Sequence, residues 1–122
     1  MPVRMRPTAV TLDCADPLEL AAFYSRATGL PLDPRSTADF AALEPGDGIA
    51  LAFQRVDGYR PPRWPGQEVP QQIHLDFAVG DPDAAQAELL ALGATAPAGQ
   101  PNAERWRVLL DPAGHPFCLV RG

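Results

Sequence analysis

Residues 9–29 read AVTLDCADPLELAAFYSRATG and describe a strand followed by a helix. The residues up to Cys14 are rich in β-formers and predict the strand. Asp16 and Pro17 predict the helix start, because the aspartate can accept bonds from free amides and proline suits the first helical position. Gly29 predicts the helix end. Apolar residues at helical spacing predict one buried face, made of Leu20, Phe23, Tyr24 and Ala27.

The second half of the chain repeats this order in residues 74–93, HLDFAVGDPDAAQAELLALG. His74 to Val79 predicts a strand, Asp81 with Pro82 predicts a helix start, and Gly93 predicts its end. The apolar face of this helix contains Ala85, Leu89 and Leu92. The matching signals lie about 65 residues apart, and a near-constant offset indicates an internal repeat.

In each copy three further segments predict short strands, and the strand signal is weakest in the segment directly after the helix. These segments are residues 30–33, 38–43 and 49–56 in the first copy, and 94–98, 104–110 and 116–121 in the second. We expect an α+β fold of two tandem β-α-β-β-β modules, at about 7–56 and 71–122, joined by a proline-rich linker at 57–70. Together they should form a single domain, 1–122, with a curved mixed sheet around a cleft.

Length and composition restrict the function. The 122 residues fit one domain, and a net charge of -5 argues against a nucleic-acid surface, which needs basic residues. No segment is apolar and long enough for a membrane span or a signal-peptide core. The two cysteines, Cys14 and Cys118, lack metal-type spacing, and we expect both to be free thiols in a cytoplasmic protein.

Three motifs carry a resemblance to a known group of proteins: DPLELAAFYSRATGL at 16–30, IHLDFAVGDPDAA at 73–85 and DPAGHPFCLV at 111–120. With the repeated module, they resemble the vicinal oxygen chelate superfamily, which includes glyoxalase I, bleomycin-resistance proteins and extradiol dioxygenases. The small bacterial glyoxalase-like group is the most similar part. The resemblance implies the fold described above and a homodimer.

The resemblance also implies positions for a metal site. In the metal-using relatives each copy gives a His or Gln from its first strand and a Glu from its last strand. His74 matches the first of these in the second copy, but Cys118 occupies the Glu position. The first copy has no ligand at the matching positions, which are Ala9 and either Leu51 or Ala52, with Gln54 nearby. A divalent metal needs about three protein ligands, so we expect no metal and no other cofactor.

His74 and Asp76 should share one face of their strand, opposite Ile73 and Leu75, and therefore look into the cleft or into solvent. Two interpretations of His74 remain open. It is either a residue that contacts a ligand and is a candidate catalytic base, or a histidine whose ring is hydrogen-bonded to the backbone. Cys118 is either a small buried hydrophobe or a thiol brought close to His74 by strand pairing.

In ERWRVLLD, residues 104–111, Trp106 and Val108 alternate with Arg105 and Arg107. A tryptophan beside a guanidinium group can grip a flat anionic or aromatic ligand. The alternative is a core tryptophan with solvated arginines. Trp64 in the linker could also grip such a ligand, and the alternative is that it lies in an exposed proline-rich loop.

Two functions from different classes remain. The first is a metal-independent protein that binds a small apolar or aromatic molecule in its cleft. The second is a lyase or isomerase of the glyoxalase type, with His74 and Gln54 as working groups. For either function, the expected ligand-contacting residues are His74, Asp76, Trp106, Arg107, Cys118 and Gln54.

Overall fold

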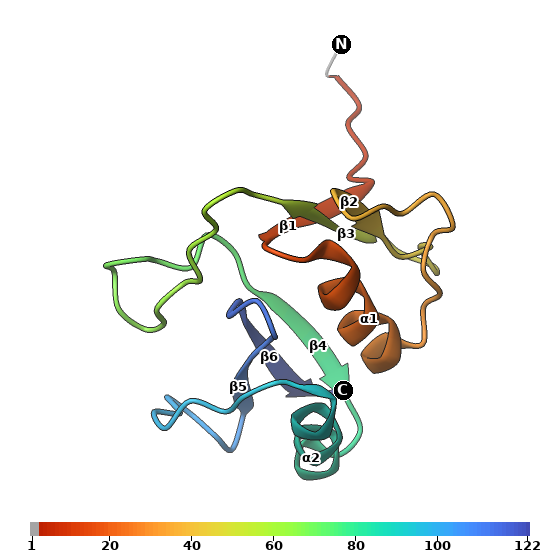
Figure 1. The fold of residues 1–122 in the computed structure, drawn as a ribbon. Coiled ribbons are helices and arrows are strands. Elements are labelled where there is room, and N and C mark those ends of the chain that lie inside the picture. The colour runs from red at the N-terminus through yellow and green to blue at the C-terminus, as the bar shows by residue number, and fades with distance from the viewer. Residues whose placement is uncertain (1–2) are drawn as a thin grey trace. The chain divides into compact units, whose positions relative to one another are not determined.

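The computed structural model describes residues 3–122 as an α+β fold with two compact units. The first unit ends at Tyr59 and the second spans Arg60–Gly122, so the boundary lies inside the segment predicted as the linker. Figure 1 shows that each unit contains one helix and its own small sheet. The two tandem modules predicted from the internal repeat are therefore present.

The first unit runs β1 (Ala9–Cys14), α1 (Pro17–Thr28), β2 (Phe40–Ala42) and β3 (Ala50–Arg55). Its sheet has the order β1-β3-β2, with β1 parallel and β2 antiparallel to β3.

The second unit has the same topology. It runs β4 (Leu75–Val79), α2 (Pro82–Leu92), β5 (Trp106–Leu110) and β6 (Pro116–Arg121). Its sheet has the order β4-β6-β5, with β4 parallel and β5 antiparallel to β6. The identical strand order and directions support the repeat read from the sequence.

Both helices begin and end as the sequence predicts. The Asp16 carboxylate accepts from the Glu19 amide at 3.2 Å, and Asp81 accepts from the amide of Asp83 at 3.0 Å. Gly29 and Gly93 close the helices in the left-handed region, with φ of 77° and 119°. Glycine adopts this conformation without a Cβ penalty.

The strand predicted directly after each helix is reduced to a single bridge, Leu32 with Leu43 in the first unit and Thr95 with Leu110 in the second. Prolines explain the loss, because Pro31, Pro34 and Pro97 have no amide hydrogen to donate to a ladder. One predicted core residue is also wrong. Ala27 is exposed, whereas Ala21, six residues closer to the helix start, is buried.

The two helices pack unequally. In the first unit, Tyr24 of α1 stacks on Phe53 of β3 with ring centroids 5.6 Å apart, and both rings are fully buried. In the second unit Leu89 is the one buried residue of α2, while Ala85 and Leu92 are half-buried. Neither described helix is both long enough and apolar enough to cross a lipid bilayer.

A tight turn joins β5 to β6. The buried Asp111 carboxylate accepts hydrogen bonds from the backbone amides of Ala113 and His115 at 2.9 Å and 3.0 Å. These bonds give two amide groups of the turn a hydrogen-bond acceptor. Gly114 has a φ of +88°, and a Cβ there would lie 2.9 Å from Cβ of Pro61. The turn thus fixes where β6 begins and holds the proline-rich segment against it.

The cap of α2 gives a test of the local fold. Asp81→Ala removes the acceptor for the first-turn amides and should lower the free energy of unfolding by about 1 kcal/mol. Asp81→Asn keeps a capping oxygen and should stay within a few tenths of the parent value. Urea unfolding followed by circular dichroism measures both variants, and equal losses from Ala and Asn would contradict the capping role.

Candidate functional site

The second unit contains a cavity of about 380 Å³. Most of its wall is apolar, formed by Trp64, Pro101, Trp106, Val108, Pro116 and Val120. Its polar side chains are Gln71, His74, Asp76 and Cys118. An apolar cavity with a few convergent polar groups has the composition of a small-molecule site.

Strand periodicity places these side chains together. Trp106 and Val108 alternate along β5, Pro116, Cys118 and Val120 alternate along β6, and His74 lies two residues before Asp76 of β4. Residues two apart on a strand share a face, so the three strands give one wall of the cavity. Trp64 and Gln71 come from the segment that leads into β4.

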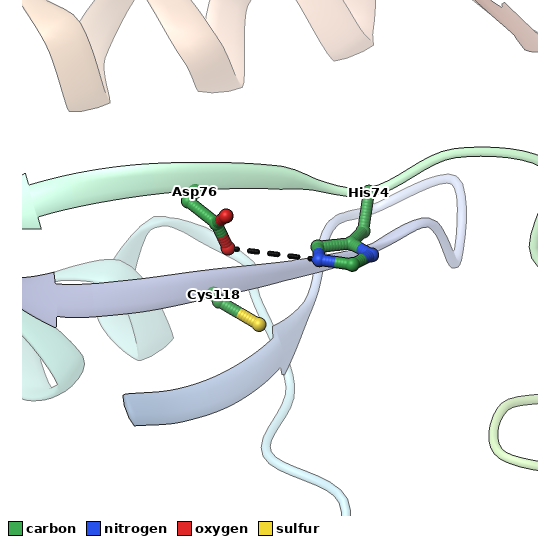
Figure 2. Close-up of side chains that lie close together, drawn as sticks. All are labelled: His74, Asp76 and Cys118. Atoms are coloured by element: carbon green, nitrogen blue, oxygen red, sulfur yellow. Dashed lines mark ion pairs between the residues drawn. The ribbon is translucent and has the colours of Figure 1, made fainter. Parts of the chain in front are cut away.

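Three of the polar groups form a cluster, shown in Figure 2. Asp76 and Cys118 are register partners on the parallel strands β4 and β6. The His74 Nε2 atom lies 3.7 Å from the Asp76 Oδ1 atom, and the ligand atoms of all three side chains lie within 4.8 Å of one another. The prediction that strand pairing brings the Cys118 thiol close to the His74 imidazole is confirmed.

The surroundings of Cys118 keep its thiol protonated. Burial raises its pKa above the ordinary value of 9.0, and the negative charge and hydrogen bond of Asp76 raise it further. The thiolate is the nucleophilic form of cysteine, so this thiol is a weak nucleophile near neutral pH. The idea that His74 activates Cys118 as a nucleophile receives no support from these electrostatics.

Gln71 also lines the cavity, although the sequence did not single it out. Its side-chain oxygen Oε1 is buried and has no hydrogen-bond partner among the described residues. A buried acceptor without a donor is rare in folded proteins and costs free energy. The Gln71 amide therefore offers an open position for a bound group. Its place three residues before the predicted strand gave no signal of this role.

Arg107, expected from the sequence to contact a ligand, does not line this cavity. Its guanidinium group points to the opposite face of the sheet, where it donates to Asp83 and Gln86 of α2 and to the Ala103 carbonyl. The alternation along β5 explains this result, because Arg107 lies between Trp106 and Val108, which face the cavity. Arg107 is thus a structural link between β5 and α2.

Gln54, which belongs to β3 of the first unit, is not among the residues that line this cavity. Its side chain is exposed, and its backbone carbonyl accepts a hydrogen bond from the Cys14 thiol at 3.6 Å. Cys14 and Cys118 are both free thiols, as predicted.

The fold is that of a small α+β protein with two duplicated modules, which is the architecture of the vicinal oxygen chelate superfamily. A family model described as a glyoxalase-like domain matches residues 9–120, and the chain belongs to this family.

Curated relatives and solved structures agree with this assignment. The chain is 34% identical over 103 residues to the "Putative glyoxylase CFP32" of Mycobacterium bovis and to that of Mycobacterium tuberculosis. The match covers 82% of this chain and 38% of each relative, so the chain spans well under half of their length.

Two solved structures share the fold. The bleomycin-binding protein of Streptomyces verticillus, solved with copper(II)-bleomycin, is 24% identical with a TM-score of 0.61, covering 99% of both chains. A glyoxalase/bleomycin resistance protein/dioxygenase family enzyme from Burkholderia phytofirmans is 20% identical with a TM-score of 0.71, covering 93% of this chain and 96% of its own.

The metal positions implied by the superfamily are only half occupied by possible ligands. In the first unit Ala9, Leu51 and Ala52 have no side-chain donor atoms. In the second unit His74 has one, and Cys118 offers sulfur where the relatives have a carboxylate. The four-ligand arrangement of the metal-using relatives does not fit this chain.

The electrostatics of Cys118 predict how fast it reacts. With Cys14 replaced by alanine, Cys118 is the one remaining thiol, and at pH 8 less than about one tenth of it should be thiolate. Asp76→Asn removes the negative charge, so the pKa of the thiol should fall and alkylation by iodoacetamide should become several-fold faster. Asp83→Asn, which alters a carboxylate outside the cavity, is the control. Equal rates for the Asp76 and Asp83 variants would contradict the coupling.

Proposed function

We propose that this protein binds a small planar molecule in the cavity of its second unit, and that this binding needs no metal. The observation that carries the proposal is the position of the tryptophans. The chain has 2, Trp64 and Trp106, and both line this one cavity. Indole rings supply large apolar contact surfaces that favour stacking against another aromatic ring.

The polar side chains restrict the chemistry of the ligand. No lysine or arginine lines the cavity within the described residues, and Arg107 faces away. Asp76 contributes a negative charge, and Gln71 offers an unpaired acceptor. These features favour a neutral or cationic ligand that has an N–H or O–H donor, rather than the anionic ligand that the sequence also allowed.

The comparisons support binding of a small molecule as the function. The bleomycin-binding protein of Streptomyces verticillus has the same fold and was solved with copper(II)-bleomycin. A binding role requires shape and apolar walls, both of which the cavity provides. By the same resemblance we propose a homodimer, for which sedimentation equilibrium should give twice the mass of the chain.

An enzyme is the second candidate, a lyase or isomerase of the glyoxalase type. The observation that favours it is the His74 and Asp76 pair on the cavity wall. A carboxylate beside an imidazole can orient it as a general base for proton abstraction next to a carbonyl group. Under this function His74→Ala should abolish turnover while the cavity still binds the substrate.

Intrinsic fluorescence tests the binding function directly, because both fluorescent tryptophans lie in the cavity. Quinoline, indole and bleomycin are suitable first probes for a wider library of heteroaromatic compounds. We expect a binder to change the emission and raise the melting temperature, and Trp106→Ala should weaken it about 10-fold or more, since one aromatic contact is worth about 1.4 kcal/mol.

Phe40→Ala is the matched control, because Phe40 is an exposed aromatic residue of the first unit. It should leave the affinity unchanged. The proposal fails if no compound of the library alters the emission, or if Phe40→Ala and Trp106→Ala weaken binding equally.

A further inference from the structure

We propose that His74, Asp76 and Cys118 form a site for a thiophilic divalent cation, of which Zn²⁺ is the best match, with an open coordination position that faces the cavity. The site lies within one module, and it uses a carboxylate, Asp76, that the family pattern does not place among the ligands. Asp76 and Gln71 also belong to the argument for the organic ligand, but the metal site does not require that ligand, because an ion can bind the three donors with no organic molecule present.

Backbone register brings the three donors together. Asp76 and Cys118 are direct partners in the parallel β4–β6 ladder, so their side chains leave the same face next to each other. His74 lies two residues before Asp76 and reaches the same face, with its Nε2 atom 3.7 Å from the carboxylate. Strand pairing therefore places Asp76 and Cys118, while His74 lies in the segment directly before β4.

The separations suit a tetrahedral ion. Zinc bonds of about 2.0–2.3 Å place neighbouring ligand atoms roughly 3.3–3.7 Å apart. The donor atoms here lie within 4.8 Å of one another, and the side chains of His74 and Asp76 are 44% and 59% exposed. Small side-chain rotations are enough to close the cluster around an ion.

The donor types select the metal. Imidazole and thiolate are zinc ligands, whereas Mg²⁺ and Ca²⁺ prefer sites made of oxygen alone. On coordination the Cys118 thiol gives its proton to solvent, and the thiolate and the Asp76 carboxylate together balance the two positive charges of the ion. No lysine or arginine among the described cavity residues competes with it.

Three protein donors leave a fourth tetrahedral position open for water or another group. Gln71 lines the same cavity, and its buried Oε1 atom has no partner among the described residues. A water molecule on the ion could donate a hydrogen bond to this oxygen. Three protein ligands with one open position is the arrangement of zinc sites that bind exogenous groups, and closed structural sites have four.

The test uses the full chain without an affinity tag, stripped with a chelator and free of organic ligand. Zn²⁺ is titrated against a chromophoric competitor, and Mg²⁺ and Mn²⁺ are titrated separately. We expect one Zn²⁺ per chain and no retention of Mg²⁺ or Mn²⁺. Cys118→Ser, His74→Ala and Asp76→Asn should each weaken Zn²⁺ binding by about 100-fold or more, since even residues that only orient metal ligands contribute about 10- to 100-fold.

The chain provides matched controls, because it has 2 cysteines and 2 histidines and one of each lies in the cluster. Cys14→Ala and His115→Ala should bind Zn²⁺ as the parent does. Co²⁺ gives a second readout, a sulfur-to-cobalt charge-transfer band that should appear with the parent and with Cys14→Ala but not with Cys118→Ser. Circular dichroism of each variant confirms that it is folded.

Failure to retain Zn²⁺ would overturn the inference, as would equal binding by Cys118→Ser and the parent, or an equal loss in both control variants. None of these results bears on the organic ligand, which the tryptophan fluorescence reports without metal present. A result in which quinoline or another compound binds and Zn²⁺ does not would therefore reject this inference and keep the proposed function.

Discussion

The parallel pairing of β4 with β6 is the constraint on which the site depends. It sets Asp76 opposite Cys118, and the two-residue period of each strand then decides which neighbours join them on the cavity wall. A shift of one residue would turn the thiol to the helix-covered face and bring an apolar side chain into its place. Two features stabilise this register, the Asp111 turn at the start of β6 and the link of Arg107 to α2 on the far side of β5.

The two units show how one topology can serve different purposes. The first unit has the better-packed core, with Tyr24 stacked on Phe53 under α1, and its strands carry alanine and leucine where metal-using relatives have ligands. The second unit has a less buried helix, and it places its polar residues on the open face of its sheet. Apolar packing is sufficient for the first unit, while the second unit presents His74, Asp76 and Cys118 at its cavity.

Much of the fold could be predicted from the sequence, because its signals are local. The Asp-Pro starts and glycine ends of both helices follow from capping and from the freedom of glycine, and the repeat itself gave the topology. The strands predicted directly after the helices are reduced to single bridges because prolines interrupt them. The prediction that Ala27 is buried was wrong because helical spacing alone does not show where the buried face ends.

The site was harder to predict than the fold. His74, Asp76, Trp106 and Cys118 were found because strand periodicity places them on one face. Arg107 does not line the cavity, which could not be predicted because the sequence does not show which face of β5 the helix covers. Gln71 was not singled out because loop segments have no periodicity, and for the same reason the sequence left Trp64 open between a ligand contact and an exposed loop residue.

The register of β4 against β6 is the central claim, and nuclear Overhauser effects in isotope-labelled protein measure it directly. We expect backbone contacts that pair Asp76 with Cys118, together with contacts from the Trp106 indole to the methyl groups of Val108 and Val120. Contacts that instead pair Leu75 or Phe77 with Cys118 would turn the thiol away from His74, and both the cluster and the cavity described here would be contradicted.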